Sequence, residues 1–157
     1  MKETSETADT RLTVAVVDDD RDVRQALSDA LTSAGFAVQL APHALKLVSA
    51  LEVDRPAVIV LDVVNSWIDG LGLCRALKRN QEYNEIPIVI VSGKSEPESI
   101  RAAFQAGAAA YFLKPLDLSR LVARIVELTR PSVEVTGEST IDVGGAGISR
   151  APPERRP

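Results

Sequence analysis

The feature that most limits how this chain can fold is the alternation of short apolar runs with segments of helical period. Five runs rich in β-branched residues indicate strands, at residues 12–17, 37–40, 57–61, 86–91 and 110–113. Between them, apolar residues recur every three or four positions, and Gly35 and Gly107 follow two of these segments as expected helix stops. Since the runs are apolar throughout, each strand should be buried on both faces, which is typical of a parallel sheet covered by helices.

These five units predict an α/β fold: a five-stranded parallel sheet with helices on both faces, in the flavodoxin-like (βα)5 arrangement. The expected strand order is 2-1-3-4-5, with right-handed crossovers. The carboxyl ends of parallel strands meet at one edge of the sheet, where open α/β sheets hold their functional sites. The residues that directly follow the strands are therefore the first candidates for a site.

The same pattern sets the boundaries of the folded part. Residues 1–11 are polar and are expected to be disordered, whereas residues 12–130 carry the alternating pattern and should form one domain. Residues 131–157 are rich in Gly, Ser, Thr and Pro and have no sustained period, which predicts a disordered tail.

Composition restricts the setting in which the chain can act. The net charge of −4 lacks the basic excess that binding to a nucleic-acid backbone needs, and no apolar run reaches the length of a membrane span. The polar first residues do not resemble a signal peptide, and a single cysteine, Cys74, excludes an internal disulfide. We expect a cytoplasmic protein that by this chain itself binds neither nucleic acid nor membrane.

Charged and hydroxyl side chains lie at the ends of four expected strands: Asp18, Asp19 and Asp20, then Asp62, Ser92 and Lys114. Two carboxylates about 4 Å apart repel by about 4 kcal/mol at a near-surface dielectric of about 20, so a positive partner is expected among them. Grouped carboxylate oxygens suit Mg²⁺, an ammonium pairs with carboxylate or phosphoryl oxygens, and a carboxylate can accept a phosphoryl group. The set is suited to forming and sensing an acyl phosphate.

Four motifs at these strand ends, "VVDDD", "VIVLD…DG", "VIVSG" and "YFLKP", resemble the receiver domain of bacterial two-component response regulators. The resemblance covers residues 12–130. It implies that Asp62 is the phosphoacceptor and that Mg²⁺ (or Mn²⁺) is held by Asp18, Asp19, Asp62 and the backbone carbonyl of Val64.

The resemblance also implies a set of phosphate-sensing residues. Ser92 is the expected switch hydroxyl, Lys114 the phosphate-pairing lysine, and Tyr111 the aromatic residue that turns inward on activation. Val64 and Lys94 occupy the positions that tune dephosphorylation, and a cis peptide bond is expected before Pro115.

The loop after the phosphoacceptor departs from the pattern of the family. Asn65 and Ser66 stand where similar proteins usually carry Met-Pro, and Gly93 replaces the usual alanine after the switch hydroxyl. An apolar Val64 cannot orient an attacking water, so we predict a long-lived phosphoryl group.

Several residues have structural interpretations. Asp20 is expected to cap the first helix, His43 to lie on the surface at the start of the second, and Cys74 to pack in the core. Ser95 and Glu98 suggest a capping box at the fourth helix. Trp67, in the loop before Asp69, could contact a partner, shield the site or pack on the loop.

The resulting functional prediction is a non-enzymatic phosphorelay receiver. A partner histidine kinase or phosphotransfer protein would phosphorylate Asp62, and the face of the fourth helix, fifth strand and fifth helix would then bind an effector or a second copy. The chain would act alone or as part of a longer protein. The alternatives are a phosphorylation-independent pseudo-receiver that acts as a scaffold and, remotely, an aspartyl-phosphate phosphohydrolase resembling the haloacid-dehalogenase group. The pattern of that group fails because Asp18-x-Asp20 is followed by Arg21 and Asp22.

Overall fold

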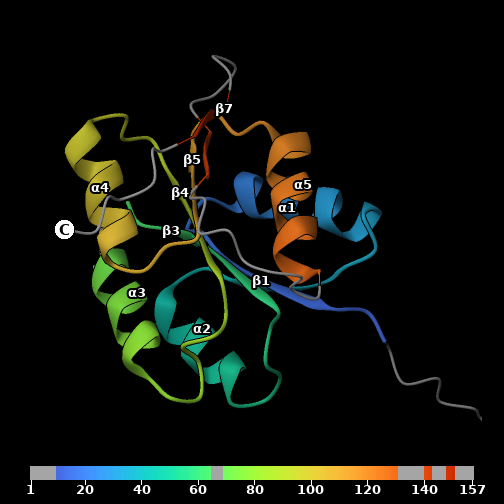
Figure 1. The fold of residues 1–157 in the computed structure, drawn as a ribbon. Coiled ribbons are helices and arrows are strands. Elements are labelled where there is room, and N and C mark those ends of the chain that lie inside the picture. The colour runs from blue at the N-terminus through green and yellow to red at the C-terminus, as the bar shows by residue number, and fades with distance from the viewer. Residues whose placement is uncertain (1–9, 65–68, 131–139, 143–147, 151–157) are drawn as a thin grey trace, which may run out of the picture.

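The structure, a computed structural model, describes residues 10–64, 69–130, 140–142 and 148–150 (Figure 1). Five strands and five helices alternate along residues 10–130, as predicted: β1 Thr13–Val17, α1 Arg21–Ser33, β2 Ala37–Ala41, α2 Ala44–Leu51, β3 Val58–Asp62, α3 Gly70–Arg79, β4 Ile88–Ser92, α4 Pro97–Gln105, β5 Ala110–Leu113 and α5 Leu118–Thr129. None of the helices in the described ranges combines the length and apolar character that crossing a bilayer requires.

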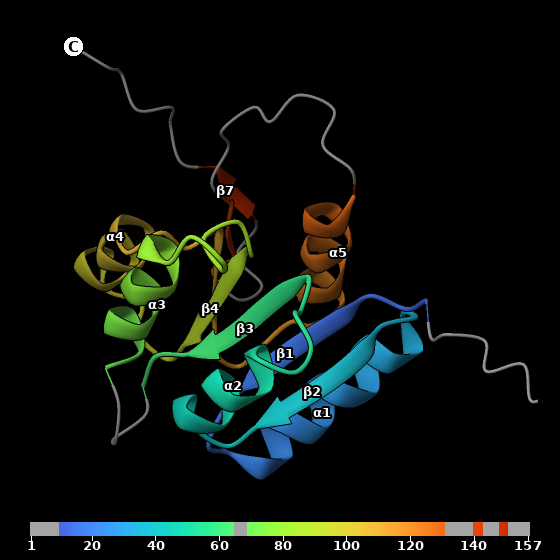
Figure 2. The same ribbon diagram turned by 90° about the horizontal axis from the view of Figure 1, so that it is seen from below.

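The predicted strand order is confirmed: β2, β1, β3, β4 and β5 are neighbours in that order, and each pair is parallel. Successive residues of a strand point to opposite faces, so each strand contributes to two cores. On one face, strand residues such as Ile59 pack with α2, α3 and α4, and Cys74 is buried there. On the other, residues such as Val60 pack with α1 and α5 (Figure 2). This two-sided burial explains the continuous apolar runs.

Two further short strands lie beyond the predicted sheet. β6 (Thr140–Asp142) pairs in parallel with β5, and β7 (Ile148–Arg150) pairs antiparallel with β6. The sheet therefore has seven strands among the described residues. These two segments differ from the expectation of a tail without regular structure.

The helix starts show which local predictions hold. Asp20 caps α1, since its side chain accepts from the backbone N–H groups of residues 22 and 23, as predicted. His43 precedes α2 and accepts from the N–H of Lys46 through Nδ1 at 3.2 Å. The expected capping box at Ser95 is wrong, because α4 begins at Pro97 and Glu96 is its N-cap without a side-chain bond. Trp67 lies outside the described residues.

Candidate functional site

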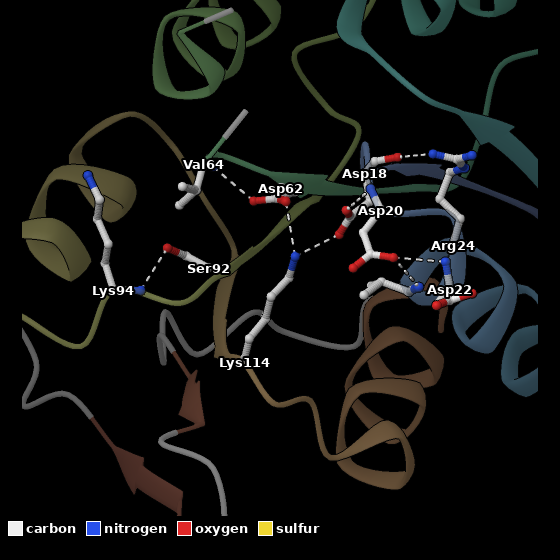
Figure 3. Close-up of polar contacts among 10 residues, drawn as sticks. Asp18, Asp20, Asp22, Arg24, Asp62, Val64, Ser92, Lys94 and Lys114 are labelled. Carbon is white, nitrogen blue, oxygen red and sulfur yellow. Dashed lines mark hydrogen bonds and ion pairs between the residues drawn. The ribbon is translucent and has the colours of Figure 1, made fainter. Parts of the chain in front are cut away.

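The carboxyl ends of four strands bring together Asp18 after β1, Asp62 at the end of β3, Ser92 at the end of β4 and Lys114 after β5 (Figure 3). Asp18 is 1% exposed and Asp62 is 5% exposed, and within residues 10–64 and 69–130 they are the only charged side chains that are buried. Burying a carboxylate is unfavourable unless a positive group compensates it. Such burial at one sheet edge therefore marks a site.

Lys114 supplies that positive group. Its Nζ donates to Asp18 Oδ2 at 2.9 Å and to Asp62 Oδ2 at 3.0 Å, so one ammonium bridges the two buried carboxylates (Figure 3). Although burial disfavours the charged ammonium, these hydrogen bonds and charges outweigh it and raise the pKa of Lys114. The lysine therefore stays protonated at neutral pH.

Asp18 is held in place through both its carboxylate and its backbone carbonyl. The N–H of Asp20 donates to Asp18 Oδ1 at 2.9 Å, and the guanidinium of Arg24 donates to the Asp18 carbonyl at 2.6 Å. Burial raises the pKa of the Asp18 carboxyl, the hydrogen bond from Lys114 opposes this rise, and the charge of Asp62 adds to it. The carboxylates thus still crowd one another.

The carboxylates of Asp18, Asp19 and Asp62 form a group that could hold a metal ion. One oxygen from each lies within 4.8 Å of the others, and Asp19 is exposed whereas the other two are buried. Two buried oxygens and one exposed oxygen suit Mg²⁺, which binds carboxylates while keeping several waters. The N–H of Val64 donates to Asp62 Oδ1 at 2.9 Å and orients that carboxylate, whereas the metal contact of the Val64 carbonyl stays a prediction.

The predicted switch residues are connected through the loop after β4. Ser92 Oγ accepts from the N–H of Lys94 at 3.1 Å, and Tyr111 Oη donates to the Lys94 carbonyl at 2.6 Å. Tyr111 is 1% exposed and packs with the core, so its ring lies in the inward position. Burial raises the pKa of Tyr111, which keeps its hydroxyl protonated as the donor.

The positions predicted to tune dephosphorylation border the site. The side chain of Val64 is exposed and lies beside Asp62, and Lys94 is exposed after Ser92 (Figure 3). The peptide bond between Lys114 and Pro115 is cis, as the resemblance implies.

Sequence reasoning missed Arg24. Its guanidinium reaches back from the first turn of α1 to the carbonyl of Asp18, the residue that follows β1. The available signal was its spacing, because a residue four positions after the N-cap lies one turn into the helix, on the face nearest that cap.

A parallel sheet in this order, with a buried acid pair bridged by a lysine at its carboxyl edge, defines a class of signalling domain. Residues 14–126 match the family described as the response regulator receiver domain, and the chain belongs to that family. Residues 14–126 are therefore a receiver domain of two-component signalling.

Similar proteins and structures agree with this assignment. The chain is 36% identical over 117 residues to the response regulator MprA of Mycobacterium avium (strain 104), covering 74% of this chain and 50% of that protein. It thus spans about half the length of the curated relatives it matches. A two-component response regulator from Clostridium difficile is similar in structure, with a TM-score of 0.72 and 26% identity, covering 79% of this chain and 100% of that one. A response regulator from Thermotoga maritima has a TM-score of 0.69 and 27% identity, covering 76% of this chain and 98% of that one.

Proposed function

We propose that this receiver accepts a phosphoryl group on Asp62 from the phosphohistidine of a partner histidine kinase or phosphotransfer protein. The observation that carries the proposal is the ammonium of Lys114 between two buried carboxylates at the sheet edge, 2.9 and 3.0 Å away. A lysine paired only for stability would not need a third acid, Asp19, beside the pair. The family assignment supports the same reading.

The transfer forms a bond between a carboxylate oxygen of Asp62 and phosphorus while the phosphorus–nitrogen bond of the donor breaks. Asp18, Asp19 and Asp62 would hold Mg²⁺, which supplies positive charge to the phosphoryl oxygens during transfer. The N–H of Val64 fixes one oxygen of Asp62, which limits the orientations of the carboxylate. Lys114 is close enough to exchange its contact with Asp62 for one with a phosphoryl oxygen.

The Ser92 hydroxyl is the proposed sensor of the phosphoryl group. Its oxygen already accepts from the N–H of Lys94, so its own proton is available to donate to a phosphoryl oxygen. Movement of Ser92 would pull on Lys94, whose carbonyl holds Tyr111. These contacts lead from Ser92 to β5, which belongs to the face of α4, β5 and α5 proposed to bind an effector or a second copy.

Val64 gives the proposed phosphoryl group a long lifetime. Its side chain is 50% exposed beside Asp62 and has no polar atom with which to position an attacking water. Lys94, the second predicted tuning residue, offers only a cation at the other border of the site.

Incubation of the full chain with acetyl phosphate and Mg²⁺, followed by intact-mass measurement, tests the proposal. We expect one added phosphoryl group in the wild type and in Asp69→Asn, a matched control because Asp69 is exposed, and none in Asp62→Asn. Uptake by Asp62→Asn, or none by the wild type, would refute it. The latter result would instead support the phosphorylation-independent pseudo-receiver. Non-enzymatic action and the cytoplasmic location stay predictions.

A further inference from the structure

The outer edge of β5 is covered by the chain itself. A terminal strand of a parallel sheet presents a row of unpaired N–H and C=O groups that another chain can pair with. Here β6 occupies that row, with Ala110 opposite Thr140, Tyr111 opposite Ile141 and Phe112 opposite Asp142. β7 then pairs with β6, and both strands lie between α4 and α5 (Figures 1 and 2).

We propose that β6 and β7 act as an intramolecular cover that prevents strands of other molecules from adding to β5. The covered edge lies in the middle of the face of α4, β5 and α5, so a partner that docks there by strand addition must first displace β6. This docking consequence rests on the proposed function, whereas the cover itself does not.

The direction of β6 favours pairing within one chain. β5, α5 and β6 follow one another in sequence, and β5 and β6 are parallel. Parallel neighbours require a crossover of a dozen or more residues, usually helical, and α5 supplies that crossover.

The sequence of the covering segment is suited to a hairpin. The five residues 143–147, which connect β6 to β7, include three glycines. Runs of three to five residues that contain glycine are typical hairpin connections. β7 also pairs with β6 at three positions, so β6 is flanked on both sides.

The cover lies on the strand that carries the proposed switch residue. Ile141 is opposite Tyr111, whose hydroxyl holds the Lys94 carbonyl, and Lys114 follows β5 by one residue. A partner strand on β5 would therefore contact the backbone of the strand that carries Tyr111 and leads directly to Lys114. Displacement of β6 becomes a step that a docking partner must accomplish.

Hydrogen exchange of the full chain, without Mg²⁺ or phosphodonor, tests the cover independently of phosphorylation. Ile141→Pro removes an N–H from a strand flanked on both sides and breaks its pairing. Those amides of residues 110–113 that face β6 should exchange about tenfold faster in Ile141→Pro, while those bonded to β4 stay unchanged. Ala151→Pro, which places a proline just after β7 and next to Pro152, is the matched control and should behave as the wild type.

A labelled peptide of residues 138–150 then probes whether the edge is free. It should bind Ile141→Pro at least about tenfold more tightly than the wild type or Ala151→Pro, because a tethered strand competes at an effective concentration in the millimolar range. The same peptide carrying Ile141→Pro should not bind. Equal exchange in all three proteins, equal peptide binding, or wild-type protection that rises with protein concentration would overturn the proposal.

Discussion

Replacing Lys114 by alanine removes the positive group between two buried carboxylates. Asp18 and Asp62 are 1% and 5% exposed, and the lysine side chain is 26% exposed. An exposed pair contributes about 0–1 kcal/mol, whereas breaking a buried pair costs about 3–5 kcal/mol because a charge stays buried without its partner. Since solvent reaches part of Lys114, we expect a loss of about 2–3 kcal/mol in the free energy of unfolding without metal.

Urea unfolding in EDTA, followed by circular dichroism, measures this loss. With a slope of about 1–3 kcal/mol per molar urea, the midpoint of Lys114→Ala should fall by about 0.7–3 M. Lys46→Ala is the control, because Lys46 is an exposed lysine of α2, and its midpoint should stay within about 0.3 M of the wild type.

Repeating the measurement with saturating Mg²⁺ tests whether the same carboxylates also bind the metal ion. A cation held by Asp18, Asp19 and Asp62 would replace the lost positive charge, so the deficit of Lys114→Ala should shrink in Mg²⁺. A metal-free loss below about 0.5 kcal/mol would refute the argument from buried charge. An equal deficit with and without Mg²⁺ would refute the assignment of these three acids as the metal site.

Four further predictions concern other residues of the site and other conditions. Because the pKa of Lys114 is raised in the folded protein, the stability that its charge contributes is present at neutral pH and is lost as pH rises above the ordinary lysine value of 10.5. In urea unfolding at alkaline pH, the difference in the free energy of unfolding between the wild type and Lys114→Ala should therefore narrow. The raised pKa of Asp18 means that ionising it disfavours the folded state, so Asp18→Asn in EDTA should gain stability relative to the wild type as pH rises above 3.8. Val64→Asn should shorten the lifetime of the phosphorylated species about tenfold, followed by intact mass over time, and an unchanged lifetime would contradict the role given to Val64. Tyr111→Phe removes the hydrogen bond to the Lys94 carbonyl and should cost about 1 kcal/mol in urea unfolding, and no loss would show that this contact is weak.

Much of the fold could be predicted because strands buried on both faces of the sheet appear in the sequence as continuous apolar runs. The apolar runs place every strand of residues 10–130 to within two residues, and the site follows because parallel strands end at one edge. The start of α4 was missed for a local reason. A residue before proline favours extended backbone, and Glu96 has φ −63° and ψ 135°, so the helix cannot begin before Pro97 and Ser95 lies outside it.

The contacts that could not be predicted depend on tertiary structure. Strands of three residues such as β6 and β7 carry too short a pattern to stand out, and only the open edge of β5 gives them a partner. The hydrogen bond from the Tyr111 hydroxyl to the Lys94 carbonyl joins residues 17 positions apart, and no local sequence pattern predicts a contact at that separation.

The bridge from Lys114 to Asp18 joins residues 96 positions apart, and it includes Asp62 from the middle of the chain. A nascent or truncated chain that ends before β5 lacks the ammonium, and one that has not closed the sheet leaves its acids dispersed in water. The proposed phosphoryl transfer would therefore require the whole domain to be assembled, and an incomplete or misfolded copy could not accept a phosphoryl group at Asp62.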